Sequence, residues 1–386
     1  MEHLSIIAQR WGRSMDQDKY IIRGQAFNWQ QIQDMSLQDL IVNNVSNMPR
    51  YLYKYYRNIV DEETGENYSL LALENNTVYL QSPDKFDDIY DCSIVFDEQE
   101  YSFMRLKYYA HYCGFIISEN YHWRYLDVFA HNLYDKILSL QNKGMTLNDA
   151  VMQTFLIRNN DTNTDLVHSM FALNLRNNLV ENWDKESALQ FAILYALNKE
   201  MEFVRKGLSK QFRVSCFSTS PFMNRMWASQ YANNHKGFCI EYEVPEYSNA
   251  NADIFNNLFP VIYSDNRVSV LDECLKYVQD KPDQELLEKI YKYGILLKSI
   301  DWIKQDEWRL VSPGNMLADD YNCEFFKISK VYLGNRMSKE DRKQIIDICK
   351  RKNIKYAGII HKKDRFELAE CPDLCENCNR LKWYNC

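Results

Sequence analysis

The chain has 386 residues, of which 46% are hydrophobic and 26% are charged, an ordinary composition for a globular protein with a sizeable core. Its net charge of −7 argues against strong non-specific nucleic-acid binding, which usually shows as a basic excess, although a local basic groove is still allowed. None of the 11 glycines lie at G-x-G spacing, so the Rossmann and Walker phosphate loops are excluded, and the H-E-x-x-H and G-x-S-x-G motifs are absent too.

The compartment is predicted from apolar runs and cysteines. No long uncharged apolar run suggests a transmembrane helix, and the N-terminal stretch MEHLSIIAQRWGRSMDQDKY does not resemble a secretory signal. The 11 cysteines are mostly scattered singly, which suits small buried residues with reduced thiols. We therefore expect a cytoplasmic protein.

The first 97 residues are expected to hold a helical lead-in and then the first strands of the core. Residues 1–48 are predicted as a polar, helical segment with an amphipathic stretch from Met35 to Val45. The aromatic run RYLYKYY at 50–56 favours a strand, and an Asn-Asn turn precedes a second strand through Val78 and Leu80. Residues 49–97 would therefore form the first part of an α+β core.

Residues 98–206 follow a helical pattern instead. Apolar residues recur every three or four positions, as in Phe129, Leu133 and Ile137. We predict an inserted helical subdomain of four or five helices.

Strands resume in residues 207–370, which would complete the α+β core, and a Cys-rich tail follows at 371–386. The predicted elements are strands at 212–220, 236–244 and 258–265, a helix near 284–299, a strand at 301–311, a strand ending at Gly334, a helix with Ser338 as its N-cap, and a final strand in KYAGIIHK.

The stretch DWIKQDEWRLV, residues 301–311, carries charge within a strand-like pattern. With a period of two, Trp308 and Leu310 fall on one face, whereas Gln305, Glu307 and Arg309 fall on the other. We predict that the first face anchors the strand in the core and that Gln305 and Glu307 point together to the opposite side.

Two charged segments near the start of the core have both functional and structural interpretations. Lys54 and Arg57 lie among aromatics and could hold a phosphate or pyrophosphate, or they could simply flank a strand. Asp87, Asp88 and Asp91 could bind the metal of a nuclease, although aspartates also serve turns by bonding their own backbone.

The strand at 212–220 ends in Ser218, Thr219 and Ser220, which leaves hydrogen-bonding groups beside a turn. Trp227 and Tyr231 follow at helical spacing, and at least one of them is expected to be a core residue.

The C-terminal tail CPDLCENCNRLKWYNC carries a compact cysteine cluster. Its four thiolates could close a tetrahedral zinc site, but the cluster lacks a pair of C-x2-C knuckles, so free thiols are the alternative. The cysteines are Cys371, Cys375, Cys378 and Cys386.

Several of these segments, taken in chain order, resemble one family. YLYKYYR, VYLQSPDKFDDIYDC, VSCFS…MW…Y…HKGFCIEY and the set Lys298, Trp302, Glu307 and Arg309 are similar to the bacterial domain-of-unknown-function family twenty-nine seventy-one, from about residue 50 to 370. Members of that family resemble abortive-infection or phage-defence components. The resemblance implies a defence role, with a cognate antitoxin or a sensor protein as a partner and no membrane.

A more distant resemblance is to ADP-ribosyltransferases of the Arg, Ser-Thr-Ser, Gln/Glu-x-Glu type, which bind NAD in a cleft of a split mixed sheet. This sequence offers Arg57, or Lys54 or Arg50, then Ser218-Thr219-Ser220, then Gln305-Asp306-Glu307, in the same order. The resemblance implies a split mixed sheet and an enzyme that consumes NAD as co-substrate, either a transferase acting on a protein or nucleic acid or an NAD glycohydrolase.

The same resemblance implies a role for each residue. Glu307 would stabilise the oxocarbenium-like ribose that departing nicotinamide leaves, and Gln305 would orient the acceptor nucleophile. Arg57 would hold the pyrophosphate, Ser218 would support Glu307 and the nicotinamide ribose, and Trp227 or Tyr231 would stack on a ring.

The alternative class is a non-enzymatic sensor or interaction module of a phage-defence or toxin–antitoxin system. In that case the helical block would be the partner surface, and Glu307 and Arg309 would form a structural ion pair.

Overall fold

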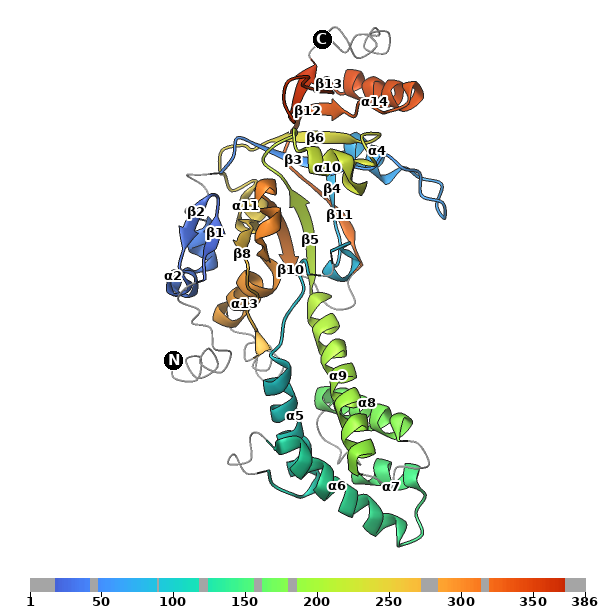
Figure 1. Ribbon diagram of the computed structural model, residues 1–386. Coiled ribbons are helices and arrows are strands. Elements are labelled where there is room, and N and C mark those ends of the chain that lie inside the picture. Colours follow the sequence, from blue (N-terminus) through green and yellow to red (C-terminus); the bar gives the residue numbers. More distant parts are fainter. Residues whose placement is uncertain are drawn as a thin grey trace. The chain divides into compact units, whose positions relative to one another are not determined.

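A computed structural model describes residues 18–41, 48–88, 90–117, 124–155, 162–179, 186–271, 284–313 and 319–371. The chain divides into two compact units (Figure 1). The α+β unit combines residues 1–92, 210–267 and 291–386, and the helical unit combines residues 93–209 and 268–290. Both helices and mixed sheets are present, so the predicted α+β class is confirmed. Within the described ranges, no helix is long and apolar enough to cross a membrane.

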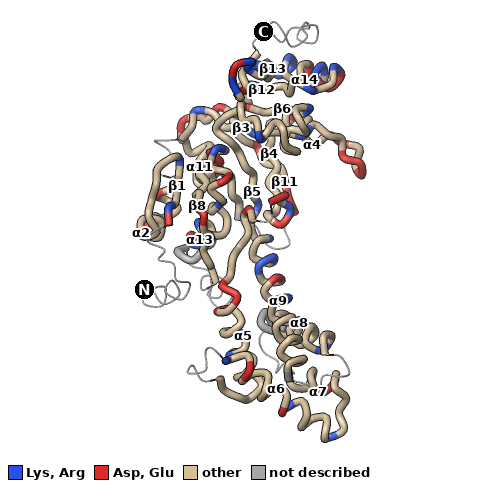
Figure 2. Tube along the Cα trace, in the orientation of Figure 1, with Lys and Arg blue, Asp and Glu red and all other residues tan. Residues whose placement is uncertain are grey.

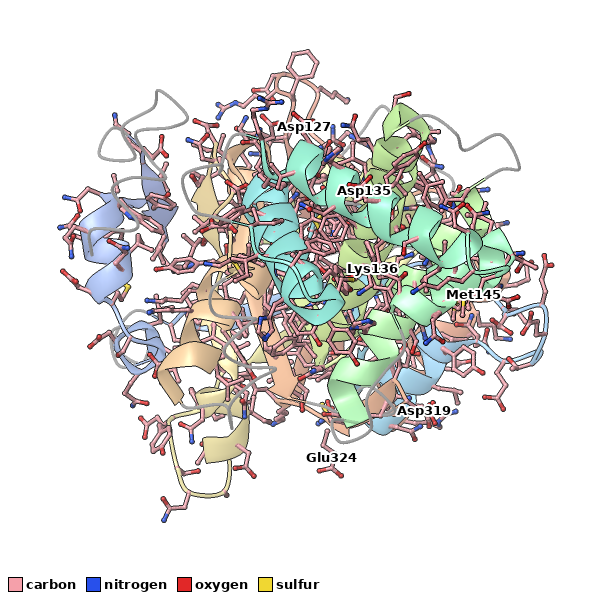
Figure 3. The ribbon with its side chains drawn as sticks, turned by 90° about the horizontal axis from the view of Figure 1, so that it is seen from below. Asp127, Asp135, Lys136, Met145, Asp319 and Glu324 are labelled. Atoms are coloured by element: carbon pink, nitrogen blue, oxygen red, sulfur yellow. The ribbon has the colours of Figure 1, made fainter. Side chains whose placement is uncertain are left out.

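Helices run through residues 98–209 of the helical unit, where the apolar spacing predicted a helical block, but the unit also includes α13, a helix that the sequence had placed in the second part of the core. Phe129, Leu133 and Ile137 are fully buried in its core, whereas the acidic Asp135 is exposed on the same helix, α6 (Figure 3). The helices are α5 (Glu98–Cys113), α6 (Tyr125–Gln141), α7 (Leu147–Thr154), α8 (Thr162–Asn178), α9 (Glu186–Ser209) and α13 (Gln284–Ile290).

The described residues of the α+β unit form four sheets. In chain order its strands are β1 (Tyr20–Ile22), β2 (Gln25–Phe27), β3 (Tyr51–Tyr56), β4 (Thr77–Leu80), β5 (Phe212–Phe217), β6 (Phe238–Glu243), β7 (Leu258–Pro260), β8 (Ile262–Ser264), β9 (Leu297–Ser299), β10 (Trp308–Pro313), β11 (Tyr321–Glu324), β12 (Ile328–Leu333), β13 (Lys355–His361) and β14 (Leu368–Cys371). The sheet orders are β14–β13–β12–β6–β3, β5–β10–β7, β2–β1–β8–β9 and β11–β4.

Short helices connect these strands. They are α2 (Trp29–Asp34), α4 (Tyr68–Asn75), α10 (Asn224–Ala228), α11 (Ala252–Asn256), α14 (Lys339–Arg351), the 3-10 helices η2 (Pro83–Lys85), η4 (Gln230–Ala232) and η6 (Ile300–Gln305), and the π-helical turn η5 (Tyr291–Ile295).

The five-stranded sheet and the three-stranded sheet meet at β3. This strand pairs along its length with β6, and its Tyr53 also exchanges two backbone hydrogen bonds of 2.8 Å with Ser218, just past the end of β5. Strands β10, β5 and β3 are therefore consecutive neighbours. The Gln-x-Glu segment, the Ser-Thr-Ser segment and the aromatic run RYLYKYY thus lie on or directly next to adjacent strands.

Residues 18–27 correct the predicted helical lead-in, because β1 and β2 form an antiparallel hairpin there. Arg23 and Gly24 at the turn both have positive φ angles, of 51° and 78°. Such a pair favours tight two-residue hairpins, whose backbone twist matches that of the strands. Residues 1–17, which also belong to the predicted lead-in, lie outside the described part of the chain.

The predicted strand at 301–311 is correct only in its second half. Residues up to Gln305 form the 3-10 helix η6, which Ser299 caps by accepting a hydrogen bond from the amide of Asp301. Strand β10 begins at Trp308, and Trp308 and Leu310 are buried in the main core as expected. Residues 258–265 are likewise divided, into β7 and β8, which lie in different sheets.

Replacing Ser338 by alanine is expected to lower the free energy of unfolding by about 1 kcal/mol, the usual cost of losing an N-cap. The Ser338 side chain accepts a hydrogen bond from the amide of Asp341 at 3.0 Å, as the sequence predicted. Urea denaturation of both proteins measures the difference. A loss below a few tenths of a kcal/mol would show that this cap contributes little.

Candidate functional site

The residues of the Lys…Trp…Glu…Arg motif come together from three elements. Lys298 lies on β9, Trp302 in η6 and Arg309 on β10, and Glu307 directly precedes β10. Asp306 separates η6 from Glu307 and has left-handed backbone angles, φ 42° and ψ 58°. Aspartate tolerates this conformation better than most residues, and it ends η6 so that the next residue can begin to pair as a strand.

Glu307 lies in a buried ion-pair network with two cations and a second carboxylate. Its Oε2 accepts a hydrogen bond from Lys298 Nζ at 2.6 Å, and its Oε1 accepts one from Arg309 Nε at 2.7 Å. Asp91 closes the network, because its Oδ2 lies 2.8 Å from Lys298 Nζ and its Oδ1 accepts from Arg309. The most exposed of the four residues, Asp91, is only 8% exposed. Two positive and two negative groups are thus buried together without net charge.

Further donors of the two cations have partners as well. Lys298 Nζ donates to the side-chain oxygen of Gln305 at 3.2 Å. Arg309 donates to the sulfur of Cys92 at 3.0 Å and to the backbone carbonyl of Ile295. The network is therefore well satisfied, as a buried charged cluster must be to persist.

Burial and charge act in opposite directions on Glu307. Burial alone would raise the pKa of its carboxyl, but the charges of Arg309 and Lys298 outweigh burial and lower this pKa to about 2. Burial would likewise lower the pKa of Lys298, yet Glu307 and Asp91 raise it above its ordinary value. At neutral pH both groups are therefore ionised.

Gln305 and Glu307 meet at Lys298, although they do not share a strand face. Gln305 is the last residue of η6, and its amide nitrogen also lies 3.1 Å from the sulfur of Met226. The expectation that a strand with period two aligns this pair was wrong. The pair converges because the left-handed turn at Asp306 brings both side chains to one ammonium group.

The Ser-Thr-Ser segment lies beside the Gln-x-Glu segment. Ser218 Oγ donates to the backbone carbonyl of Gln305 at 3.0 Å, and Thr219 Oγ1 donates to Asp306 at 2.9 Å. The carbonyl of Ser220 accepts from the hydroxyl of Tyr55 at 2.8 Å. Ser218 thus contacts the turn that carries Glu307 rather than the Glu307 carboxylate itself.

Register places Glu307, Ser218, Tyr53 and Glu241 in one row. Ser218 and Glu307 each lie one residue beyond the Phe217–Trp308 pair, Ser218 pairs with Tyr53, and Tyr53 pairs with Glu241 of β6. Directly opposed residues point to the same side of a sheet. In agreement, the Tyr53 hydroxyl donates to Glu241 at 3.0 Å.

The basic residues predicted for the pyrophosphate lie elsewhere. Lys54 alternates with Tyr53 along β3 and so points to the opposite face, where its ammonium donates to Ser215 at 2.8 Å. Arg57 follows the end of β3 and forms an exposed ion pair with Asp87 at 3.1 Å. Arg50 lies over the ring of Tyr51. Neither Lys54 nor Arg57 makes a direct contact with Glu307 or Ser218.

The two aromatic candidates differ in exposure. Trp227 is fully buried, and its indole nitrogen donates to the carbonyl of Pro221 at 2.7 Å, so it is a core residue. Tyr231 is half-buried, and burial raises the pKa of its hydroxyl to about 12. The charge of Lys298 lowers this pKa slightly and the charge of Glu307 raises it slightly. Its hydroxyl makes no hydrogen bond to the described residues, which leaves it available to a ligand.

The acidic segment does not form a metal site in the described residues. Asp91 belongs to the ion-pair network, Asp87 pairs with Arg57, and Asp88 accepts from the amide of Tyr90 at 2.9 Å, as in a turn. No group of three possible metal ligands occurs among the residues that the structure describes.

The proposed zinc cluster lies mostly beyond the described part of the chain. Cys371 is described and lies buried at the end of β14. Cys375, Cys378 and Cys386 lie outside the described residues, so the zinc site stays a prediction.

Sequence reasoning missed some residues of the site and misjudged others. Tyr263 of β8 accepts a hydrogen bond from the Glu307 amide at 2.8 Å, and nothing in its spacing marked it. Asp91 was considered only as a metal ligand or a turn residue. Arg225 of α10 was missed as well: its guanidinium lies 3.5 Å from the ring centre of Trp302, and that ring also lies 5.1 Å from Lys298 Nζ.

A family model described as "Protein of unknown function (DUF2971)" matches residues 226–310. This is the family twenty-nine seventy-one that the motif order suggested. The match begins within α10 and ends on β10, so it includes Tyr231, Lys298, Glu307 and Arg309 but neither β3 nor the Ser-Thr-Ser segment. No curated protein and no solved structure matched the chain significantly.

Proposed function

We propose that the chain is a defence-associated effector that consumes NAD in the bacterial cytoplasm, as an ADP-ribosyltransferase or NAD glycohydrolase. The observation that carries this proposal is the hydrogen bond of 3.0 Å from Ser218 Oγ to the Gln305 carbonyl, which joins the residue after β5 to the last residue of η6. The transferase resemblance requires the Ser-Thr-Ser and Gln-x-Glu segments to adjoin. The contacting residues are 87 positions apart in the chain, so their contact does not follow from sequence proximity. It therefore supports the proposal.

The proposed reaction breaks the bond between ribose C1′ and the nicotinamide nitrogen, and the bonding electron pair leaves with nicotinamide. A hydroxyl or amine of a macromolecule, or water, forms the new bond to C1′ and releases a proton. The Glu307 carboxylate would stabilise the positive charge that develops on the ribose. A carboxylate offers about four acceptor positions, and Lys298 and Arg309 occupy two of them. Positions are thus left for a ribose hydroxyl.

The cation for the pyrophosphate is reassigned in this proposal from Arg57 to Arg225. Arg225 is exposed, and the only hydrogen bond of its side chain to the described residues is to the carbonyl of Asp301 at 3.3 Å. It precedes Met226, whose sulfur contacts Gln305. A guanidinium on an aromatic ring keeps its donors directed outward, which suits binding of a pyrophosphate.

A second candidate function is favoured by the pairing of Glu307. Glu307 is 4% exposed and its carboxylate is bonded to two cations, which is how a purely structural glutamate would be placed. In that case the chain is a non-enzymatic sensor or interaction module, and the motif only stabilises the fold.

An NAD-turnover assay with the wild type and Glu307→Gln distinguishes the two. If Glu307 stabilises the transition state, release of nicotinamide or labelling of an acceptor should fall by roughly a hundredfold. Circular dichroism must show that the variant is folded. Glu74→Gln, which alters an exposed glutamate paired with Arg351, is the matched control and should keep full turnover.

Gln305→Ala provides a second variant in case Glu307→Gln does not fold. It should reduce transfer to a macromolecule more than release of nicotinamide, because Gln305 is assigned to the acceptor rather than to the ribose. Absence of NAD turnover by the folded wild type, with and without bacterial lysate as acceptor, would favour the interaction module.

A further inference from the structure

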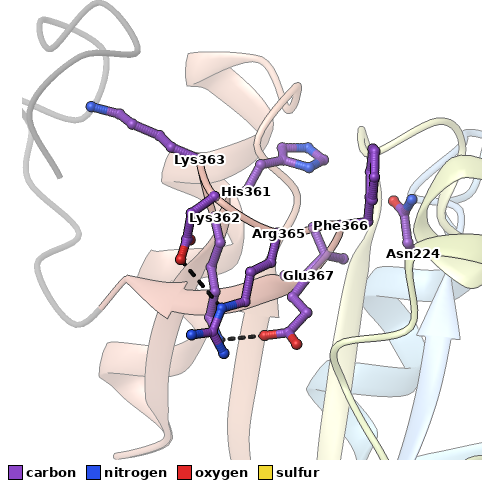
Figure 4. A pocket seen from close by; sticks show the side chains of 9 residues that line it. Asn224, His361, Lys362, Lys363, Arg365, Phe366 and Glu367 are labelled. Carbon is purple, nitrogen blue, oxygen red and sulfur yellow. Dashed lines mark hydrogen bonds and ion pairs between the residues drawn. The ribbon is translucent and has the colours of Figure 1, made fainter.

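The turn between β13 and β14 borders a cavity that no step above uses. The cavity has a volume of about 270 Å³ and is lined by residues 361–368 and by Asn224 at the start of α10 (Figure 4). Ligand pockets begin at about 300 Å³. The space therefore suits one small group, such as a single nucleobase, rather than a whole dinucleotide.

Phe366 is the most unusual residue of this turn. Its ring is fully exposed, at 106%, whereas most phenylalanines of the described chain are buried. In Figure 4 it stands beside Asn224, and His361 points to the same side of the turn. An exposed ring beside a polar cavity is a stacking surface for a planar base.

Three cationic residues are close to Phe366 in the chain. Lys362, Lys363 and Arg365 lie within four residues of Phe366, and Figure 2 shows basic and acidic residues mixed at this turn. Lys362 pairs with Glu367 at 2.6 Å and Arg365 with Asp364 at 3.2 Å, both exposed. Exposed ion pairs contribute little free energy, so phosphates can replace the carboxylates at small cost. Three cations against two acids leave the turn positive in a chain whose net charge is −7.

We propose that this turn and the start of α10 bind single-stranded nucleic acid, with Phe366 stacked on a base and Lys362, Lys363 and Arg365 facing phosphates. Aromatic stacking combined with backbone cations is the usual way proteins bind single strands. Asn224 precedes Arg225, so the cavity adjoins the residue assigned to the NAD pyrophosphate. If the chain is the proposed transferase, the bound strand would be the acceptor of ADP-ribose. In this respect the inference rests on the proposed function, and it names nucleic acid as the class of acceptor.

Fluorescence anisotropy with the full chain and a labelled oligothymidine of about 15 nucleotides, within known site sizes, tests binding directly. Phe366→Ala should weaken binding by at least about fivefold, the lower end for one stacked base. Phe191→Ala removes another exposed aromatic, from α9, and should leave binding unchanged.

The salt dependence tests the cations. With three phosphate contacts, affinity should fall roughly tenfold to twentyfold between 50 and 200 mM salt, because single-strand binding scales with a slope near −0.7 per contact. The double variant Lys363→Gln, Arg365→Gln removes two of these contacts and should flatten that slope by about 1.4. The control Lys339→Gln, Lys343→Gln, on the exposed side of α14, should not change it.

Several outcomes would overturn the inference: no binding by the wild type, equal binding by Phe366→Ala, or capture of AMP without capture of the strand, which would indicate a free nucleotide. NAD turnover is measured separately. Turnover without strand binding removes only this inference, whereas strand binding without turnover removes only the proposed enzyme.

Discussion

Replacing Arg309 by methionine is expected to lower the free energy of unfolding by about 3–5 kcal/mol, the usual loss when one partner of a buried ion pair is removed. Arg309 is fully buried and contacts both Asp91 and Glu307. Without it, two buried carboxylates share the single charge of Lys298, so one negative charge is left uncompensated. A domain of ordinary stability has only about 5–15 kcal/mol to lose.

Arg351→Met is the matched control, because it removes a surface arginine that is also paired with a glutamate. Arg351 bonds to Glu74 at 2.7 Å, but the two side chains are 59% and 41% exposed. Exposed pairs contribute about 0–1 kcal/mol, so this variant should unfold nearly as the wild type does. Urea denaturation at neutral pH compares all three proteins. Equal losses in the two variants would show that the network at Arg309 does not stabilise the fold.

The fold was predictable from the sequence where local pattern decides structure. Ser338 with Asp341, and the Asn-Asn turn before Val78, are local signals, and both are found in place. Residues 301–305 show where local pattern fails. Their alternation resembles a strand, yet Ser299 caps a 3-10 helix there and Asp306 ends this helix with left-handed backbone angles. The spacing of apolar residues predicts neither the cap nor the left-handed residue.

The site was predictable only in part, because its contacts are distant in sequence. The motif order indicated Lys298, Glu307 and Arg309, and these three residues meet. The sequence does not reveal that Asp91 joins them, because Asp91 lies 218 residues from Arg309. The nearby Asp87 and Asp88 also carry carboxylates that could pair with Arg309. Likewise, which face of β3 adjoins Ser218 depends on register, and that register turned Lys54 away from Glu307.

Acid should destabilise the protein partly through Glu307. The pKa of this carboxyl is lowered in the folded state from its ordinary 4.5 to about 2. A lowered pKa means that the ionised form stabilises the fold above the ordinary value, and that this stabilisation is lost as the pH falls towards 2. The amount at stake is of order 3 kcal/mol, lost mainly between about pH 5 and pH 2.

Glu307→Gln isolates this contribution, because glutamine does not titrate. The variant is expected to be less stable than the wild type at pH 7 and to lose less stability between pH 5 and pH 3, since the other carboxyl groups titrate equally in both proteins. Urea denaturation across this range measures the difference, and Glu74→Gln should follow the wild type. Parallel curves for Glu307→Gln and the wild type would contradict the coupling to Lys298 and Arg309. The same stability data also separate structure from chemistry: a loss of NAD turnover beyond the fraction unfolded at neutral pH would mean that Glu307 acts on the substrate as well as on the fold.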